Sequence, residues 1–156
     1  MKAFNVFVRP TLDYCSNLWS PYRKSEIDLI ESVQRRFTKC LKGMKGLQYS
    51  DRLKYLAIES LELWRLKADL YMYYKIITGL VDLPIEEFFV FKKGVTRNNG
   101  ASIYINKYHA NAERYYFKNR HINAWNSLPT SVVSSMSLNA FKRSLEGIDF
   151  SKYLRS

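Results

Sequence analysis

The sequence predicts a mainly α fold: a helical domain with a minor β-hairpin near residues 90–105. Three observations predict it. Apolar residues recur at three- to four-residue spacing over long stretches, helix-capping residues precede those stretches, and strand-like runs occur only in one short region rich in turn residues. With 156 residues, of which 47% are hydrophobic, the chain can bury a core, and we expect a single domain over residues 1–156.

The N-terminal region, Met1 to Trp19, is expected to be helical with a kink at Pro10, because proline lacks the amide donor. Ser25, with acidic residues after it, is typical of a helix start, and a long helix is expected from there. Gly43 or Gly46 can end this helix. Its predicted buried face contains apolar residues at helical spacing, namely Ile30, Val33, Phe37, Cys40, Leu41 and Met44.

A central helix is expected after a short helical turn that opens at Ser50-Asp51. Ser60 is its predicted cap, and it runs to Thr78-Gly79. Almost everything outside one narrow charged face is apolar, so we expect this helix to lie at the centre of the core. The charged face consists of Glu62, Arg65 and Asp69.

Shorter elements are expected in the second half of the chain. Pro84 to Phe89 predicts one helical turn, and turn-forming residues bracket the apolar runs of the expected hairpin. A helix over Asn111 to Asn126 is expected to end before Pro129, and Ser137 is expected to cap a last helix.

The chain carries a strong positive charge. Twenty-five Lys and Arg residues against fourteen Asp and Glu residues leave a formal net charge of +11. Such a charge favours polyanionic partners, with nucleic acid first among them. A basic surface can also serve only to keep a protein in solution, and composition leaves both readings open.

Several classes of site and segment are not expected. Cys15 and Cys40 are far apart and lack metal-ligand spacing, so we expect two reduced core thiols and neither a disulfide framework nor a zinc site. The apolar run before Arg9 is too short for a secretory signal, and we expect an intracellular protein, with nucleus or cytoplasm left open. The uncharged stretch from His121 to Phe141 contains polar residues and Pro129, so no membrane span is expected.

Short motifs run through nearly the whole chain in one order. They are Val8–Tyr14, Trp19–Pro21, Ile27, Leu29–Arg36, Thr38–Lys39, Tyr49–Leu53, Leu56, Ser60–Glu62, Arg65, Asp69–Leu70, Tyr74–Ile76, Phe88–Phe89, Thr96–Arg97, Arg120, Ile122, Trp125–Pro129, Val132–Val133, Ser137 and Phe141–Lys142. In this order the motifs resemble the jockey-like and chicken-repeat-like LINE (non-LTR) retrotransposon reverse transcriptases, in the region that follows the polymerase palm.

This resemblance implies a thumb-side or connector-like region of an RNA-directed DNA polymerase, encoded by a transposable element and truncated here at its N-terminus. Such a region helps to hold template and primer but does not catalyse. Two positions depart from the family pattern. The chain has Trp64-Arg65 where relatives carry Arg-Arg, and Arg97-Asn98 where they carry Arg-Gly, which puts one phosphate contact in doubt at each place.

Catalysis is not expected in this chain. DNA synthesis needs two metal ions held by neighbouring carboxylates, which the family supplies with an aromatic-Ala-Asp-Asp motif. The sequence contains no Asp-Asp pair. Glu86-Glu87 fits an exposed helical turn, and neither His109 nor His121 has a partner at ligand or triad spacing. We therefore expect no active site, no metal and no cofactor.

The expected site is a basic surface that binds RNA, DNA or their hybrid without sequence preference, because Lys and Arg neutralise phosphate and aromatic rings stack on bases. One cluster ends the first long helix, where Glu31 is spaced to pair with Arg35. A second cluster surrounds Tyr115 to Phe117 and includes His121. The candidate contacts are Arg35, Arg36, Lys39, Lys42, Lys45, Arg65, Arg97, Arg114, Lys118 and Arg120.

Two other readings of these residues stay open. The aromatic side chains can pack in the core while the cations form a merely solvated face. Alternatively, the chain is a helical interaction module that docks on a polymerase core or on another protein through Phe4, Phe7 and Val8.

Overall fold

A computed structural model of the chain describes residues 3–92 and 102–155. These residues are mostly helical, which confirms the predicted mainly α class. They group into two compact units: unit 1 contains Met1–Leu66 with Leu154–Ser156, and unit 2 contains Lys67–Tyr153. The boundary falls within the long helix α4 (Leu61–Ile77), which contributes its first residues to one unit and the rest to the other.

Unit 1 begins with a π-helical segment, η1 (Phe4–Val8), that continues into α1 (Arg9–Asp13). Pro10 lies in the first turn of α1, directly after the π-helical segment. The helix expected as far as Trp19 ends earlier, at Asp13, because Tyr14 is extended and Cys15 has a positive φ of 51°. The chain then turns and enters α2 (Lys24–Lys39), which is followed by α3 (Tyr49–Leu56).

The buried face of α2 differs from the predicted one. Its fully buried residues are Ile27, Glu31, Gln34 and Thr38, three of them polar, whereas Val33 and Cys40 are exposed. Both faces satisfy a 3.6-residue period, and the polar face is buried because its groups find hydrogen-bond partners inside the unit. Both cysteines are exposed, so the expectation of core thiols was wrong.

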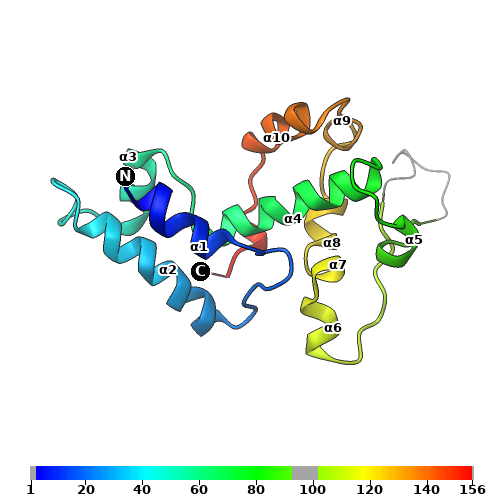
Figure 1. Cartoon of the computed structure of the whole chain (residues 1–156), viewed down its shortest axis with the longest axis horizontal. Helices are drawn as coiled ribbons and strands as arrows, with labels where there is room; N and C mark the ends of the chain where they lie inside the picture. Colours follow the sequence, from blue (N-terminus) through cyan, green and yellow to red (C-terminus); the bar gives the residue numbers. More distant parts are fainter. Residues whose placement is uncertain (1–2, 93–101, 156) are drawn as a thin grey trace. The chain divides into compact units, whose positions relative to one another are not determined.

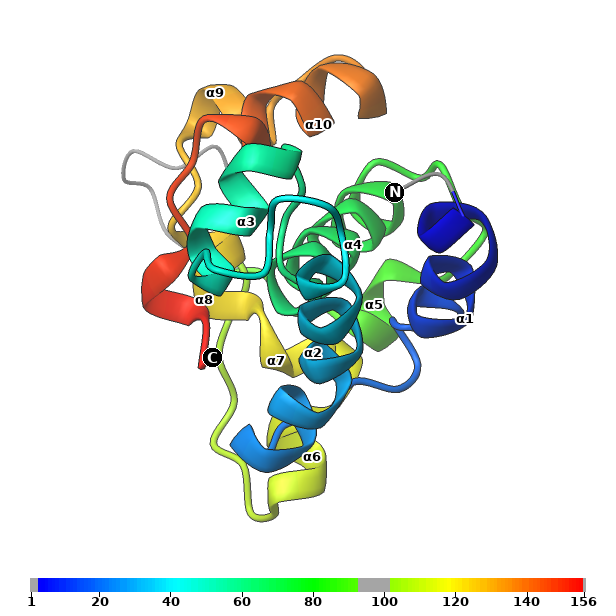
Figure 2. The ribbon, with the colours of Figure 1, turned by 90° about the vertical axis from the view of Figure 1, so that its left-hand side faces the viewer.

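The ends of α2 also differ from expectation. Ser25 makes no side-chain capping bond, since the helix begins one residue earlier, at Lys24. The helix ends at Lys39, ahead of both predicted glycines. Gly43, with a φ of 81°, instead forms part of the loop that leads to α3. Figure 2 shows this loop as the cyan segment between α2 and α3.

Unit 2 is built around the C-terminal part of α4. In Figure 1, α7 (Phe117–Arg120) and α8 (Ile122–Asn126) lie on one side of it, and α9 (Thr130–Val133) and α10 (Leu138–Glu146) on the other. The predicted central position of this helix is confirmed, since it contributes Leu70, Tyr73, Tyr74 and Ile76 to the core. The remaining short helices are α5 (Ile85–Phe88), α6 (Asn111–Tyr115) and η2 (Ser151–Tyr153).

The second half of the chain matches several predicted boundaries. The helical turn before Phe89 forms as α5, and Ser137 caps α10 by accepting a hydrogen bond from the amide of Ala140. The helix expected over Asn111 to Asn126 is instead three short helices, because Tyr116 adopts an extended conformation and His121 also leaves the helical region.

The expected hairpin is represented by one antiparallel bridge, between Phe91 and Ile103. Two backbone hydrogen bonds flank it, from Lys92 to Ser102 and from Tyr104 to Val90. The side chain of Asn126 holds Ile103 on both sides, accepting from its amide and donating to its carbonyl at 2.8 Å each. Residues 93–101, which include the predicted turn, lie outside the described residues. Within residues 3–92 and 102–155, no helix has the length and hydropathy to cross a membrane.

Candidate nucleic-acid interface

The strongest basic feature of unit 1 is the C-terminal turn of α2 with the loop after it. Residues 32–50 contain five cations and no Asp or Glu. Four of these cations have exposed side chains and form no ion pair with any residue that the structure describes. We call them the basic tip: Arg36, Lys39, Lys42 and Lys45.

The buried side chain of Arg52 connects the end of α2 to the loop that carries part of the basic tip. Its side chain is buried, with 4% exposure, and donates to the carbonyls of Arg35 at 3.2 Å and Leu47 at 3.0 Å and to Thr38 Oγ1 at 3.2 Å. A cation at the C-terminal end of a helix interacts favourably with the negative end of the helix dipole. The contact to Leu47 ties the loop to the end of α2, so the four exposed cations project from a fixed frame.

Arg35 borders the tip but has partners of its own. Its guanidinium carbon lies 5.1 Å from the ring centroid of Tyr49, and a terminal nitrogen lies 4.0 Å from Asp28. The structure pairs Arg35 with Asp28 and not with Glu31, the partner expected from the sequence. Glu31 is buried and accepts hydrogen bonds from the Tyr49 hydroxyl and, at 2.9 Å, from the amide of Leu61. Burial raises the pKa of the Glu31 carboxyl, and burial beside Glu31 raises the pKa of the Tyr49 hydroxyl.

Arg65 was a predicted phosphate contact, but its side chain serves unit 1 internally. It is 4% exposed, donates to the carbonyl of Leu12 at 2.5 Å and lies 4.4 Å from the ring centroid of Trp19. A cation in this position links the turn after α1 to α4. We therefore leave Arg65 out of the candidate interface.

Arg120 also turns inward, within unit 2. Its guanidinium makes a two-pronged contact with Asp69, at 2.5 and 2.7 Å, and Asp69 Oδ2 also lies 3.4 Å from His121 Nε2. Asp69 is fully buried, so the charged face predicted for α4 is not a solvent face. Sequence reasoning singled out both partners of this ion pair but did not pair them, because 51 residues separate them. Arg120 and His121 are accordingly not available for phosphate.

The other predicted contacts of unit 2 remain at its surface. Arg114 is exposed and Lys118 is half-buried, in α6 and α7 respectively. Of the aromatic residues between them, Phe117 is buried in the core, Tyr115 is half-buried and Tyr116 is exposed. Arg97, the remaining predicted contact, lies outside the described residues.

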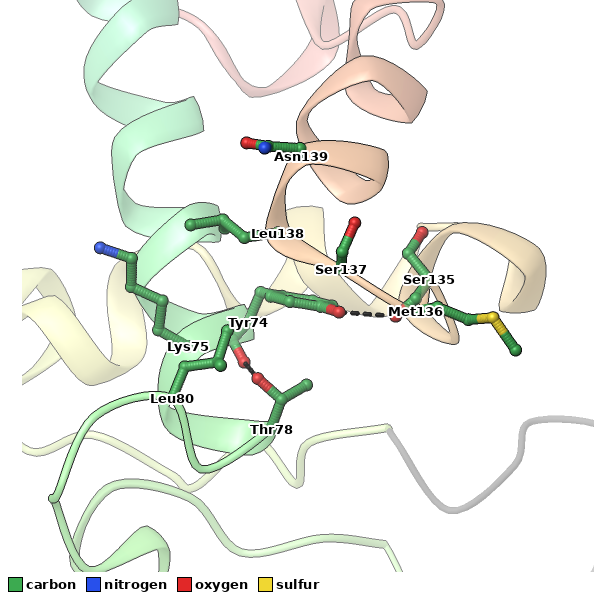
Figure 3. Close-up of a pocket in the computed structure, with 9 residues that line it drawn as sticks. All are labelled: Tyr74, Lys75, Thr78, Leu80, Ser135, Met136, Ser137, Leu138 and Asn139. Carbon is green, nitrogen blue, oxygen red and sulfur yellow. Dashed lines mark hydrogen bonds between the residues drawn. The ribbon is translucent and has the colours of Figure 1, made fainter.

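Unit 2 has an open depression with a volume of about 650 Å³ between the end of α4 and the start of α10. Figure 3 shows its lining: the hydroxyls of Tyr74 and Thr78 bond to backbone carbonyls, and no Cys, His or carboxylate takes part. No group of three metal-ligating side chains occurs among the described residues.

Comparisons with protein-family models, with curated proteins and with solved structures found no match for this chain.

Proposed function

We propose that this chain is a non-catalytic region of a LINE-type retrotransposon reverse transcriptase and contributes sequence-independent contacts to nucleic acid. The observation that carries the binding proposal is the basic tip: four exposed cations that form no ion pair with a described residue, on a stretch that lacks acidic residues. The order of the motifs supports the assignment to this class of polymerase.

The basic tip suits contacts to phosphate rather than to bases. The aromatic rings nearest to it in the chain are already engaged: Phe37 stacks on Phe4 at 4.5 Å, and Tyr49 lies beneath Arg35 and Arg52. Base-edge readout needs side chains that enter a groove in a specific arrangement, whereas phosphate contacts need only placed charge. We therefore propose that unit 1 binds the backbone of nucleic acid with little sequence preference.

Salt dependence tests this proposal directly. Each phosphate contact on duplex DNA contributes about 0.9 to the slope of log affinity against log salt. We expect replacement of Arg36, Lys39, Lys42 and Lys45 by Gln to weaken binding equally across sequences and to lower the slope by up to about 3.6. Gln keeps a helix propensity close to that of Lys and Arg, and circular dichroism reports whether α2 is preserved.

A second variant serves as the matched control. Replacing four other exposed cations by Gln removes the same charge, and the residues are Lys24, Lys92, Lys142 and Arg143. We expect this control variant to retain most of the affinity and slope of the unchanged chain. An equal loss in both variants would show that net charge alone causes binding, and no loss in either would overturn the proposal.

A protein-docking function is the alternative candidate, and one observation favours it. Phe7 and Leu18 are about three-quarters exposed, at 76% and 75%, in the N-terminal segment of unit 1. The face predicted from Phe4, Phe7 and Val8 is present only in part, because Phe4 is buried against Phe37. Docking on a polymerase core through this apolar surface would depend little on salt, unlike phosphate contacts. A Phe7→Ser change that abolishes binding to a polymerase core and leaves nucleic-acid affinity intact would favour it.

The proposal includes the absence of polymerase activity in this chain alone. No adjacent aspartates can hold the two metal ions of nucleotide transfer. We expect no DNA synthesis on a primed RNA template with magnesium or manganese. Template-dependent incorporation that survives stringent purification would overturn this expectation.

A further inference from the structure

The corner between α6 and α7 carries a half-exposed aromatic ring with one cation two residues before it and another two residues after it. Tyr116 is 50% exposed, and no ring pair, cation–ring contact or side-chain hydrogen bond joins it to another described residue. Arg114 and Lys118 flank it at two residues on either side, in the last turn of α6 and the first turn of α7. We infer that this corner binds unpaired bases of single-stranded nucleic acid, with the Tyr116 ring as the stacking surface and Arg114 and Lys118 beside the phosphates.

Hydrogen bonds fix the backbone of the corner although the Tyr116 side chain is exposed. The Tyr116 carbonyl accepts hydrogen bonds from the amides of Asn119 at 3.0 Å and Arg120 at 3.1 Å. The Asn119 side chain donates to the carbonyl of Glu113 at 2.8 Å, which joins α7 back to α6. A ring on a fixed frame loses little conformational freedom when a base stacks on it, so more of the contact energy is available for binding.

The next residue, Phe117, shows why Tyr116 faces outward. Phe117 is 6% exposed and meets the ring of Tyr73 edge-on at 5.2 Å, while its carbonyl accepts the Tyr73 hydroxyl at 2.7 Å. Together with the Arg120–Asp69 ion pair, this contact anchors α7 in the core of unit 2. The anchoring leaves the preceding ring half-exposed at the corner and outside the buried aromatic core of the unit.

The local charge suits a polyanion. Arg114 is exposed, with its guanidinium carbon 5.6 Å from the ring centroid of Tyr115, and the Lys118 ammonium lies 3.4 Å from the carbonyl of Glu87. Glu113 is the one acidic residue within α6 and α7, and its carboxylate accepts the amide of His109. Neither cation is consumed by an ion pair with a described residue.

Stacking distinguishes this corner from the basic tip of unit 1. A base offers its face to an aromatic ring only when it is unpaired, whereas phosphate is accessible in single strands and duplexes alike. The corner therefore adds affinity for single strands specifically. This inference rests on the proposed function, because it assigns a second contact to the same class of partner.

The test compares the full chain with Tyr116→Ala and Tyr116→Phe, using fluorescence anisotropy on a labelled oligothymidylate and on a duplex of the same length at one salt concentration. Loss of one stacked base weakens binding roughly tenfold. We expect Tyr116→Ala to lose about that much affinity for the single strand and almost none for the duplex. Tyr116→Phe should bind as the unchanged chain does, because it keeps the ring.

Two controls separate the possible failures. Tyr14→Ala removes another exposed tyrosine, 73% exposed and without a cation within four residues, and should leave both affinities unchanged. The four-fold Gln variant of the basic tip should weaken both ligands. If the unchanged chain binds both ligands but Tyr116→Ala binds them equally well, the inference fails while the proposed function stands. If the unchanged chain binds neither ligand, both fail, and the exposed ring is better read as a protein contact.

Discussion

The two units bury different chemistry. Unit 1 buries a polar network with Gln34 at its centre. The amide nitrogen of Gln34 donates to the Tyr49 hydroxyl at 3.1 Å and to the Glu59 carbonyl at 2.9 Å, and its amide oxygen accepts from Arg9 at 3.2 Å. Unit 2 closes over aromatic rings. Tyr73 contacts Phe89, Phe117 and Trp125 with centroid distances of 4.7, 5.2 and 6.1 Å, while Tyr74 stacks on Phe141 at 4.5 Å.

This contrast shows which part of the sequence information determines the fold of each unit. Aromatic packing depends on area and shape, and its residues are recognisable in a sequence as apolar. A polar network depends on every member finding its partner, and a partner far away in the chain is not visible in a local pattern. Unit 1 should therefore respond to substitutions through lost hydrogen bonds, and unit 2 through lost volume.

The largest expected effect is in the aromatic core. Tyr73→Ala should lower the free energy of unfolding by about 3–5 kcal/mol, because it leaves a cavity among three rings and removes the bond to the Phe117 carbonyl. Tyr73→Phe should cost only about 1 kcal/mol, the net value of the hydrogen bond. Urea unfolding followed by circular dichroism measures both. Lys142→Ala, an exposed change in the same unit, should stay within about 0.5 kcal/mol, and three equal values would refute the assignment of the core.

The next effect concerns Arg52 in unit 1. Arg52→Ala should cost about 1–3 kcal/mol, because it removes the buried donor that bonds to the Leu47 carbonyl and to Thr38 Oγ1. Because the loop loses its attachment to α2, amide hydrogen exchange between Cys40 and Leu47 should also accelerate. Lys54→Ala, an exposed cation in the same helix α3, is the control. Unchanged exchange rates in the loop would show that Arg52 does not hold the basic tip in position.

A pH series probes the polar network. Burial raises the folded-state pKa of Glu31 above its ordinary value of 4.5, so its contribution to stability is fully present below pH 4.5 and is lost as pH rises through the folded-state pKa. The stability of the unchanged chain relative to Glu31→Gln should therefore fall over this window, by at most about 1.4 kcal/mol per pH unit. Urea midpoints from pH 3.5 to 7 measure the difference. A difference that rises with pH would contradict the assigned cause.

The smallest effect compares two serines with the same sequence signature. Ser137 caps α10, whereas Ser25 makes no capping bond in α2. Ser137→Ala should cost about 1 kcal/mol, and Ser25→Ala should stay within about 0.5 kcal/mol. Thermal melts distinguish the two. A larger loss at Ser25 would mean that α2 begins with a different cap in solution.

Local pattern in the sequence was sufficient for one group of features. It determined the mainly α class, the central position of α4, the cap of α10 and the cationic stretch that ends α2. Each of these features depends on a pattern among residues that are close together in the chain. Helical periodicity indicates the helices, a serine three residues before the amide that it accepts indicates the cap, and a stretch without acidic residues indicates the cationic region. The basic tip was accessible to sequence reasoning for that reason, since a stretch of cations without nearby acidic residues is visible in the sequence itself.

Tertiary structure alone decided which charged and polar groups face inward. It buried Arg65 and paired Arg120 with Asp69, which removed two predicted phosphate contacts, and it chose the polar face of α2 over the apolar one. The physical reason is that burying a charge or an amide is unfavourable alone and becomes tolerable only when a distant residue supplies a partner. The same anchoring of α7 turned Phe117 inward and left Tyr116 exposed, a choice between adjacent rings that composition and spacing could not make.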